Sequence, residues 1–342
     1  MLSRKINSRL FIGRSLLAVA SLVLLSGLAK ASSAATLYIA DYQTPGQVSS
    51  DPGIVGGPIS NPYILSPAPP AGSRIIDVGA DSAAGKIFYS FRFVGPDTRI
   101  IGSANLDGTG ATTIVSGTDP AQGLAVDTVN QKVYWINVNT NTLWSANYDG
   151  SGAAAIDNGL IPGTESLAID VANNKYYFVG FTSGFIGQGN LDGSGTPNTA
   201  FLNTGNGALD GVDLDLVNNK IYWSNGPTQN VGVANLNGTN INNAFVTGTG
   251  GANDVEVDPI GGHVYWSNPT LGTIGRSDLA VLGNPAATGV SLSYITGVGA
   301  PWGMDIVQDV VEAVPEPSTF ILSAFGLAGL GLVAWRKRRI AA

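Results

Sequence analysis

Short apolar runs recur along the chain at a nearly fixed spacing. Each period holds an apolar run that ends in an aspartate, then a turn, and then an alternating run that carries aromatic residues. The alternating runs read GKIFY (85–89), QKVYW (131–135), NKYYF (174–178), NKIYW (219–223) and GHVYW (262–266). The aspartates are Asp81, Asp127, Asp170, Asp215 and Asp258, which lie 46, 43, 45 and 43 residues apart. Such a period, with about four strand-sized runs, predicts a β-propeller with one blade per period.

One complete period, 123–156, shows the expected strands. Gly123–Asp127 is a continuous apolar run, which favours an innermost strand buried against the neighbouring blades. Lys132–Ile136 alternates and carries aromatics, as a second strand does, and Thr142–Asn147 fits a third. Asp149-Gly150 is a hairpin signal before the outermost strand. The same turn recurs as NLDG (105–108), NYDG (147–150), NLDG (190–193) and NLNG (235–238).

This combination of runs resembles the YWTD repeat of the low-density-lipoprotein receptor class B type, whose pattern is GLAVD, KxYW and NLDG. The resemblance covers roughly 74–310 and implies the propeller fold of that family. The tetrad itself differs, because the chain has YWIN (134–137), YFVG (177–180), YWSN (222–225) and YWSN (265–268). Asparagine keeps a turn-side hydrogen bond but not the charge. The resemblance therefore supports the fold and not the family's receptor-type binding of partners.

The two ends of the repeat region complement each other. Gly303–Val307 matches the innermost run of the other blades, but no second run follows it. Leu37–Asp41 supplies the missing run from the start of the chain. A sixth blade shared by both ends would close the ring and remove the open sheet edges of a linear array. The sequence thus predicts an all-β, six-bladed propeller over 36–312, with 42–73, rich in Pro, Gly and Ser, as a long irregular loop.

Residues 1–35 have the pattern of a secretory signal peptide. Arg4, Lys5, Arg9 and Arg14 precede the apolar run 15–28, which is short for a membrane-spanning helix. Cleavage sites are offered by Ser32-x-Ala34 and Ser33-x-Ala35. An uncleaved anchor is the alternative.

The C-terminal segment, 313–342, has three parts in a fixed order. The sequence Pro315-Glu316-Pro317 is followed by a run of apolar residues at 320–335. As an α-helix this run would be about 24 Å long, so we expect a transmembrane helix. A basic tail follows, formed by Arg336, Lys337, Arg338 and Arg339, which favours a cytoplasmic end and an exported body.

This order resembles the PEP-CTERM sorting signal of Gram-negative bacteria, which a membrane protease-transpeptidase called exosortase recognises. The resemblance implies cleavage near the Pro-Glu-Pro motif and delivery from an inner-membrane intermediate to the cell surface or extracellular matrix. A plain C-terminal anchor that happens to carry these residues is the alternative.

Negative charge is concentrated in the region between the two end segments. The chain has 17 basic and 24 acidic residues, for a net charge of −7. Five of the basic residues lie in the first 35 positions and four in the tail, which leaves about −16 on the body. Such a surface repels phosphate backbones, so no nucleic-acid partner is expected. With no cysteine, the fold must be held by its core rather than by disulfides.

Aligning the repeats shows a set of candidate site residues. The position before each innermost run holds Ile76, Gln122, Glu165, Asp210, Asn253 and Trp302. Because a closed ring relates these positions by rotation, we expect the six side chains to surround one mouth of the central channel. Gln122, Glu165, Asp210 and Asn253 carry oxygen donors, two of them charged, which is the ligand chemistry of Ca²⁺.

Two function classes remain open on these residues. A similar oxygen ring holds the metal of gluconolactonase-like six-bladed propellers, and that likeness implies a Ca²⁺-dependent hydrolase or lactonase. Carboxylates at this position also occur in YWTD repeats without a metal. The other class is a non-catalytic cell-surface or matrix protein that binds polysaccharide, proteins or cations, for example in an exopolysaccharide or biofilm matrix. We favour this second class for two reasons. The chain carries two sorting signals, and apart from the carboxylates of the oxygen ring its sequence shows no set of residues suited to proton transfer.

Two further features read as structural. The lone histidine, His263, stands at the lysine position of the repeat and is predicted to be a half-exposed strand residue. The Tyr-Trp pairs occupy a fixed place in the blades, which predicts core packing between sheets rather than an aromatic binding stripe.

Overall fold

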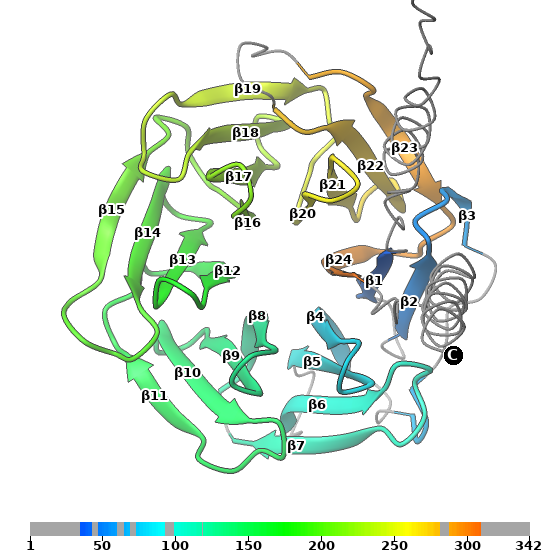
Figure 1. Cartoon of the computed structure of the whole chain (residues 1–342), viewed down its shortest axis with the longest axis vertical. Helices are drawn as coiled ribbons and strands as arrows, with labels where there is room; N and C mark the ends of the chain where they lie inside the picture. The colour runs from blue at the N-terminus through cyan, green and yellow to red at the C-terminus, as the bar shows by residue number, and fades with distance from the viewer. Residues whose placement is uncertain are drawn as a thin grey trace, which may run out of the picture. The chain divides into compact units, whose positions relative to one another are not determined.

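The computed structural model describes residues 35–42, 47–59, 65–68, 73–92, 99–117, 119–280 and 287–308. These residues form six sheets arranged around a central channel (Figure 1). The innermost strand of each sheet contacts the innermost strands of both neighbouring sheets. The predicted all-β, six-bladed propeller is therefore confirmed.

Each blade is an antiparallel sheet whose strands follow one another outward. Blades one and two consist of β4 (Arg74–Asp81), β5 (Lys86–Arg92), β6 (Arg99–Asn105), β7 (Thr112–Ser116), β8 (Ala121–Asp127), β9 (Lys132–Asn137), β10 (Thr142–Asn147) and β11 (Ala154–Asp157). Blades three and four consist of β12 (Thr164–Asp170), β13 (Lys175–Gly180), β14 (Phe185–Asn190), β15 (Asn198–Asn203), β16 (Val212–Asp215), β17 (Lys220–Asn225), β18 (Asn230–Asn235) and β19 (Asn242–Thr247). Blade five consists of β20 (Val255–Asp258), β21 (His263–Asn268), β22 (Thr273–Asp278) and β23 (Ser291–Thr296).

Blade six is built from both ends of the propeller. Its innermost strand, β24 (Pro301–Gln308), pairs with β1 (Ala35–Asp41), which pairs in turn with β2 (Gln47–Pro52). The register places Leu37 opposite Ile306 and Tyr38 opposite Asp305. Closure of the ring by the N-terminal strand is confirmed, and the seam between the chain ends lies inside a hydrogen-bonded sheet.

The repeated aspartates shape the turn between the first and second strand of each blade. Asp127 is buried, and its carboxylate accepts hydrogen bonds from the backbone N–H groups of Val129 (3.0 Å) and Asn130 (2.8 Å). The turn then requires a left-handed residue before the lysine position. That position holds Gly85, Gln131, Asn174, Asn219 and Gly262, all with φ between 53° and 79°. Glycine and asparagine tolerate this conformation best, which explains why four of the five are Gly or Asn.

The aromatic residues of the second strands form the core, as predicted. Trp223 and Trp266 are fully buried, and each ring lies across the strand pair over a glycine, Gly232 and Gly275 respectively. A Cβ added at either glycine would lie within 2.2 Å of the ring, so only glycine fits beneath it. Removing a buried ring of this size typically costs about 3–5 kcal/mol of stability.

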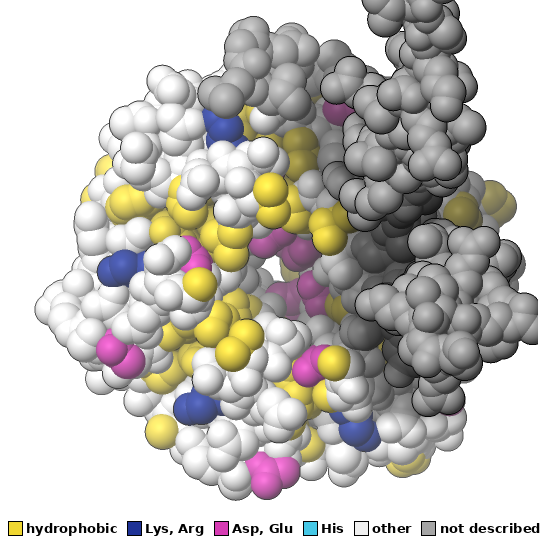
Figure 2. Space-filling view, viewed as in Figure 1, with side chains coloured by type: hydrophobic (Ala, Val, Ile, Leu, Met, Phe, Trp, Pro, Cys, Tyr) yellow, Lys and Arg dark blue, Asp and Glu magenta, His cyan; other side chains and the backbone are white. Residues whose placement is uncertain are grey.

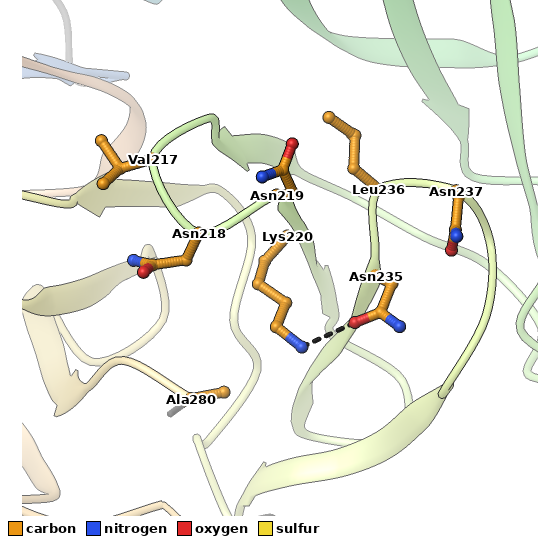
Figure 3. A pocket seen from close by; sticks show the side chains of 8 residues that line it. All are labelled: Val217, Asn218, Asn219, Lys220, Asn235, Leu236, Asn237 and Ala280. Atoms are coloured by element: carbon orange, nitrogen blue, oxygen red, sulfur yellow. Dashed lines mark hydrogen bonds between the residues drawn. The ribbon is translucent and has the colours of Figure 1, made fainter. Parts of the chain in front are cut away.

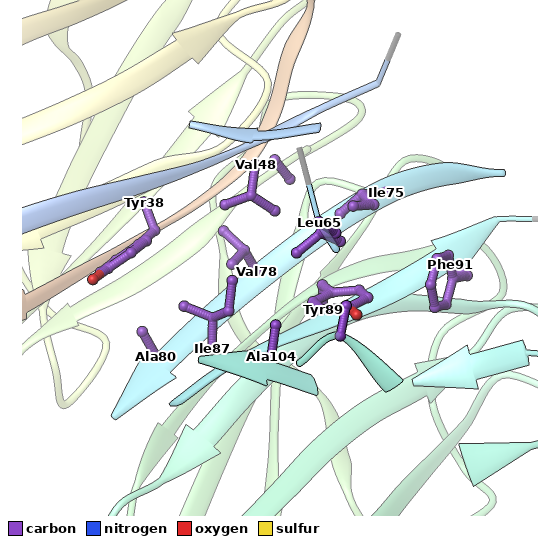
Figure 4. Packing of buried hydrophobic residues seen from close by; sticks show 12 residues of the cluster. Tyr38, Val48, Leu65, Ile75, Val78, Ala80, Ile87, Tyr89, Phe91 and Ala104 are labelled. Atoms are coloured by element: carbon purple, nitrogen blue, oxygen red, sulfur yellow. The ribbon is translucent and has the colours of Figure 1, made fainter. Parts of the chain in front are cut away.

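The segment predicted as an irregular loop, 42–73, is in part regular, so that prediction is wrong in part. Besides β2, it contributes β3 (Gly57–Pro58), which adds a parallel strand to blade five beside β23. Leu65 is fully buried between blades six and one, among Tyr38, Val48 and Ile87 (Figure 4). The segment therefore straps blade six to both of its neighbours. Pro and Gly content indicated a break in periodicity but not these tertiary contacts.

Neither end segment falls within the described residues. The signal peptide (1–35, except Ala35), the sorting motif and the predicted transmembrane helix lie outside them, so the helix stays a prediction. Among the residues that are described, no helix is long and apolar enough to cross a membrane.

Candidate functional site

The six predicted mouth residues converge where the innermost strands begin, at what we call the N-terminal mouth. Its pocket is lined by all of them: Ile76, Gln122, Glu165, Asp210, Asn253 and Trp302. Six blades thus contribute one side chain each, as expected from rotation. The volume of this pocket is about 20 Å³, which is room for about one water molecule.

Hydrogen bonds hold the polar side of this mouth. The carboxylate of Asp210 accepts a hydrogen bond from the backbone N–H of Gly226 at 2.7 Å. Burial, with a smaller contribution from the charge of Glu165, raises the pKa of Asp210 to about 7 against the lowering effect of that hydrogen bond. Burial also raises the pKa of Glu165, while a hydrogen bond from Gln122 and the charge of Arg92 oppose the rise. The two carboxyls are therefore electrostatically linked across the pocket.

The apolar side of the mouth is an aromatic stack. Trp302 stacks on Tyr42, with ring centroids 4.7 Å apart and ring planes 29° apart. The guanidinium of Arg74, the first residue of β4, lies 4.3 Å from the centroid of the Tyr42 ring. Stacked rings and a cation over a ring face are mutually favourable. This stack fills the part of the mouth that belongs to blade six.

The four oxygen-donor residues can offer a cation two carboxylates and two amides. Within the described part of the chain, no group of three or more His, Cys, Asp or Glu residues is placed to hold a metal ion. A Ca²⁺ site at Gln122, Glu165, Asp210 and Asn253 would thus depend on amide oxygens for half of its protein ligands. The Ca²⁺ site stays a prediction.

Deeper in the channel, the structure shows acidic residues that sequence reasoning missed. Asp77 and Asp254 take the glycine position of the innermost run, and Asp213, Glu256 and Asp305 take its alanine position. Acidic side chains line the central opening (Figure 2), and Asp213, Glu256 and Asp305 share a cavity of about 130 Å³. A carboxylate inside a continuous apolar run was the available signal.

Four of these carboxylates connect one blade to the next. Each accepts a hydrogen bond from the backbone N–H one position further along the innermost strand of the following blade, and Ser166 does the same with its hydroxyl. The bonds run from Leu124 to Asp77 (2.7 Å), Val212 to Ser166 (3.1 Å), Val257 to Asp213 (2.8 Å), Met304 to Asp254 (2.7 Å) and Ala80 to Asp305 (2.6 Å). We call them the blade clasps. They satisfy N–H groups that no sheet partner reaches.

Burial of the channel carboxylates, together with their closeness to one another, changes their protonation. Burial raises the pKa values of Asp77, Asp213 and Asp305 to about 7 each. Burial also raises the pKa values of Asp254 and Glu256 well above the usual range, and the charges of their acidic neighbours add to the rise. A hydrogen bond between Glu256 and Asp213 favours the sharing of a proton. The channel therefore holds protons at pH values where exposed carboxyls have lost theirs.

A larger open groove lies at the edge of blade four. Its volume is about 740 Å³, and it is lined mainly by amides and one lysine from the β16–β17 turn and the β18–β19 hairpin (Figure 3). Lys220 donates a hydrogen bond to Asn235 Oδ1 at 2.7 Å, and Val217 and Leu236 supply its apolar surface. Groups of this kind can contact a polar ligand.

His263 behaves as the sequence predicted. It lies on β21, is half-buried, and has Nδ1 at 3.2 Å from Asp278 Oδ1. Burial lowers its pKa, and the charge of Arg276 lowers it further. These contacts are those of a strand residue at the lysine position of the repeat.

Comparison with protein families identifies one segment. The model of the PEP-CTERM protein-sorting motif matches residues 313–339. That range contains Pro315, Glu316, Pro317 and the basic tail, so the predicted sorting signal is confirmed. Such a signal marks an exported protein that exosortase processes.

Comparison with solved structures gives the fold. A chain of a nidogen/laminin complex matches with a TM-score of 0.65 and 15% identity, covering 81% of this chain and 99% of that one. A structural genomics protein of unknown function from Bacteroides thetaiotaomicron matches with a TM-score of 0.49 and 13% identity, over 71% of this chain and 76% of that one. The first likeness supports the propeller fold. No curated protein matches the chain.

Proposed function

We propose that this chain is a cell-surface or extracellular-matrix propeller with a non-catalytic binding or structural role, released by exosortase at its Pro-Glu-Pro motif. The observation that carries the proposal is the sorting signal at 313–339, which begins five residues after β24, the strand that closes the ring. A closed propeller next to such a signal is a rigid body ready for display outside the cell. In this proposal, the released propeller lies in an exopolysaccharide or biofilm matrix.

The shape of the channel supports binding over catalysis. The N-terminal mouth has room for about one water molecule, whereas a lactone or a sugar needs several times that space. Four of the deeper carboxylates accept hydrogen bonds from backbone N–H groups of the following blade, so these carboxylates have a role in holding neighbouring blades together. A Ca²⁺-dependent hydrolase or lactonase at this mouth remains the alternative function.

The surface chemistry supports neutral or cationic ligands. The net charge of −7 for the whole chain, and about −16 for the body, disfavours polyanions such as nucleic acid. The groove of blade four offers amides and apolar contacts instead, a combination that suits polysaccharide hydroxyls and pyranose faces. Partners on the cell surface would meet the loops of the blades.

The sorting step is tested by replacing Glu316 with Ala in the native host. We expect the variant to stay in the membrane with its C-terminal segment attached, so its mass exceeds that of the released wild type. Glu312→Gln is the matched control, because this acidic residue lies just outside the matched motif. Unchanged release and mass for the Glu316 variant would show that the segment is only an anchor.

The binding role is tested with matrix polysaccharide purified from the same host. We expect the wild type to co-sediment with this polysaccharide and to leave a panel of sugar lactones unhydrolysed, with or without Ca²⁺. Turnover that disappears in Glu165→Gln would favour the alternative function instead.

A further inference from the structure

The turns between the first and second strands of the blades share one unusual position. The second residue after each repeated aspartate is apolar in all five copies: Ala83, Val129, Ala172, Val217 and Ile260. All five are exposed, with 77% of Val129, 68% of Val217 and 63% of Ile260 accessible. Turns that face only water are normally built from Gly, Asn, Asp and Ser. A repeated, exposed apolar residue therefore points to a surface that is covered at one stage of the protein's path to the cell surface.

These five turns lie at the same end of the ring, which we call the turn face. Figure 2 shows this face, with hydrophobic side chains gathered around the central opening and basic side chains farther out. Each turn joins an innermost strand to the second strand, at the end opposite the N-terminal mouth. Leu216, next to Val217, adds a further exposed apolar side chain.

The chain leaves the propeller on the turn face. Gln308, the last residue of β24, accepts a hydrogen bond from the Ser82 hydroxyl at 3.0 Å through its carbonyl. Its side chain donates to Asp258 Oδ1 at 3.0 Å. Ser82 and Asp258 belong to turns of this face, so the exit of the chain lies among the apolar turn tips.

The length of the tether limits where the membrane can be. Residues 309–319 separate Gln308 from the apolar run that starts at Phe320. Fully extended, they reach about 40 Å. The height of the ring, set by the eight residues of β24, is about 26 Å. A tether that had to pass around blade six to the N-terminal mouth would use nearly all of its reach, whereas the turn face is adjacent.

We infer that the turn face rests on the lipid bilayer that holds the sorting segment, with Val129, Val217 and Ile260 inserted among the lipid headgroups. This inference rests on the proposed function, because it requires the sorting segment to be in the membrane before release. Lys86, Lys132, Lys175 and Lys220 begin the second strands on this face, and Asp107, Asp149 and Asp192 lie on its outer hairpins. The five repeated aspartates are buried in the turns of the same face, so acidic groups outnumber basic ones there. Apolar insertion and the tether, rather than charge attraction, therefore hold the face in place.

Docking in this orientation points the N-terminal mouth and its aromatic stack away from the membrane.

Single-cysteine labelling tests the inference on the full chain, which has no native cysteine. Val217→Cys, Leu271→Cys and Ala328→Cys are each labelled with an environment-sensitive fluorophore. Leu271 is the matched control, because it is 57% exposed and lies between β21 and β22, on the face of the N-terminal mouth. The labelled chains are reconstituted into phosphatidylethanolamine/phosphatidylglycerol vesicles that contain a nitroxide-labelled lipid as quencher.

We expect quenching at positions 328 and 217, with at least about twofold stronger quenching at 217 than at 271. Quenching at 328 with equal, weak quenching at 217 and 271 would overturn docking while leaving membrane anchoring intact. Stronger quenching at 271 would place the opposite face on the membrane and refute the inference. No quenching at 328 would refute anchoring itself, and docking with it.

A second variant separates insertion from simple proximity. Ile260→Asp places a charge in the neighbouring turn tip, and we expect it to reduce quenching at position 217 to the level of position 271. Leu271→Asp is the control and should leave quenching at 217 unchanged. Both substitutions are at exposed sites, so the fold should persist. Unchanged quenching at 217 in Ile260→Asp would show that the apolar tips are not inserted.

Discussion

The blade clasp between blades six and one predicts an inverted pH dependence of stability. Asp305 accepts a hydrogen bond from the N–H of Ala80 at 2.6 Å, and burial raises its pKa from 3.8 to about 7. In the unfolded chain the carboxyl loses its proton near pH 4, whereas in the propeller it keeps the proton until about pH 7. The folded state binds more protons in this window, so the free energy of unfolding falls as pH rises from about 4 to 7.

The magnitude follows from the shift. A rise of the pKa from 3.8 to about 7 corresponds to a loss of about 4 kcal/mol between these pH values. Part of the shift comes from the charge of Asp213, so this is an upper value for Asp305 alone. Replacing Asp305 by Asn keeps an acceptor for the Ala80 N–H and removes the ionisation. Asp305→Asn should therefore gain about 1–4 kcal/mol relative to the wild type on going from pH 4 to pH 8.

Urea unfolding followed by tryptophan fluorescence measures this difference at pH 4, 5, 6, 7 and 8. Asp107→Asn is the control, because Asp107 is fully exposed and its hydrogen bonds from Thr109 lower its pKa. Its difference from the wild type should stay flat between pH 5 and 8. A flat difference for Asp305→Asn, or one that falls with rising pH, would refute the idea that this clasp carries a proton in the folded state.

Three other predictions concern the strap, the mouth and the N-terminus. Leu65→Ala should cost about 2–5 kcal/mol in urea unfolding, because Leu65 is fully buried between blades, and Val55→Ala, 76% exposed in the same segment, should cost much less; equal losses would contradict the strap. Millimolar Ca²⁺ should raise the melting temperature of the wild type but not of Glu165→Gln/Asp210→Asn, and equal responses would leave a structural role only. N-terminal sequencing of the exported protein should find Ala35 as the first residue. The carbonyl of Ala35 accepts a hydrogen bond from the Gly53 N–H at 2.7 Å, and Ala35 pairs with Gln308 of β24. A protein that starts at Thr36 would show that this pairing does not constrain cleavage.

The tetrad substitutions show how far residue type could be read from the sequence. Asn225 and Asn268 accept hydrogen bonds from the backbone N–H groups of Thr228 (2.9 Å) and Leu271 (3.0 Å). Asparagine thus keeps the turn-side bond, as expected from its side-chain chemistry. This part of the resemblance could be judged residue by residue, because the interaction is local and the spacing between partners is three residues.

The candidate site was predictable in position but not in chemistry. Gln122, Glu165, Asp210 and Asn253 were expected around one mouth, because equivalent residues of a closed ring meet at its axis, and they share one pocket. The size of that pocket and the raised pKa of Asp210 depend on burial. Burial is set by packing between blades, which the repeat pattern does not specify.

The sequence by itself determined the number of blades, the strand that closes the ring and the aromatic core, because each follows from a repeat whose period the chain must satisfy. The tertiary structure alone decided the blade clasps and the strap through 42–73. In a clasp such as Asp77 to Leu124, the carboxylate and the N–H lie 47 residues apart. The stagger between neighbouring innermost strands brings them together, offset by one position. That offset arises from how the blades pack around the axis, so no pattern within a single repeat records it.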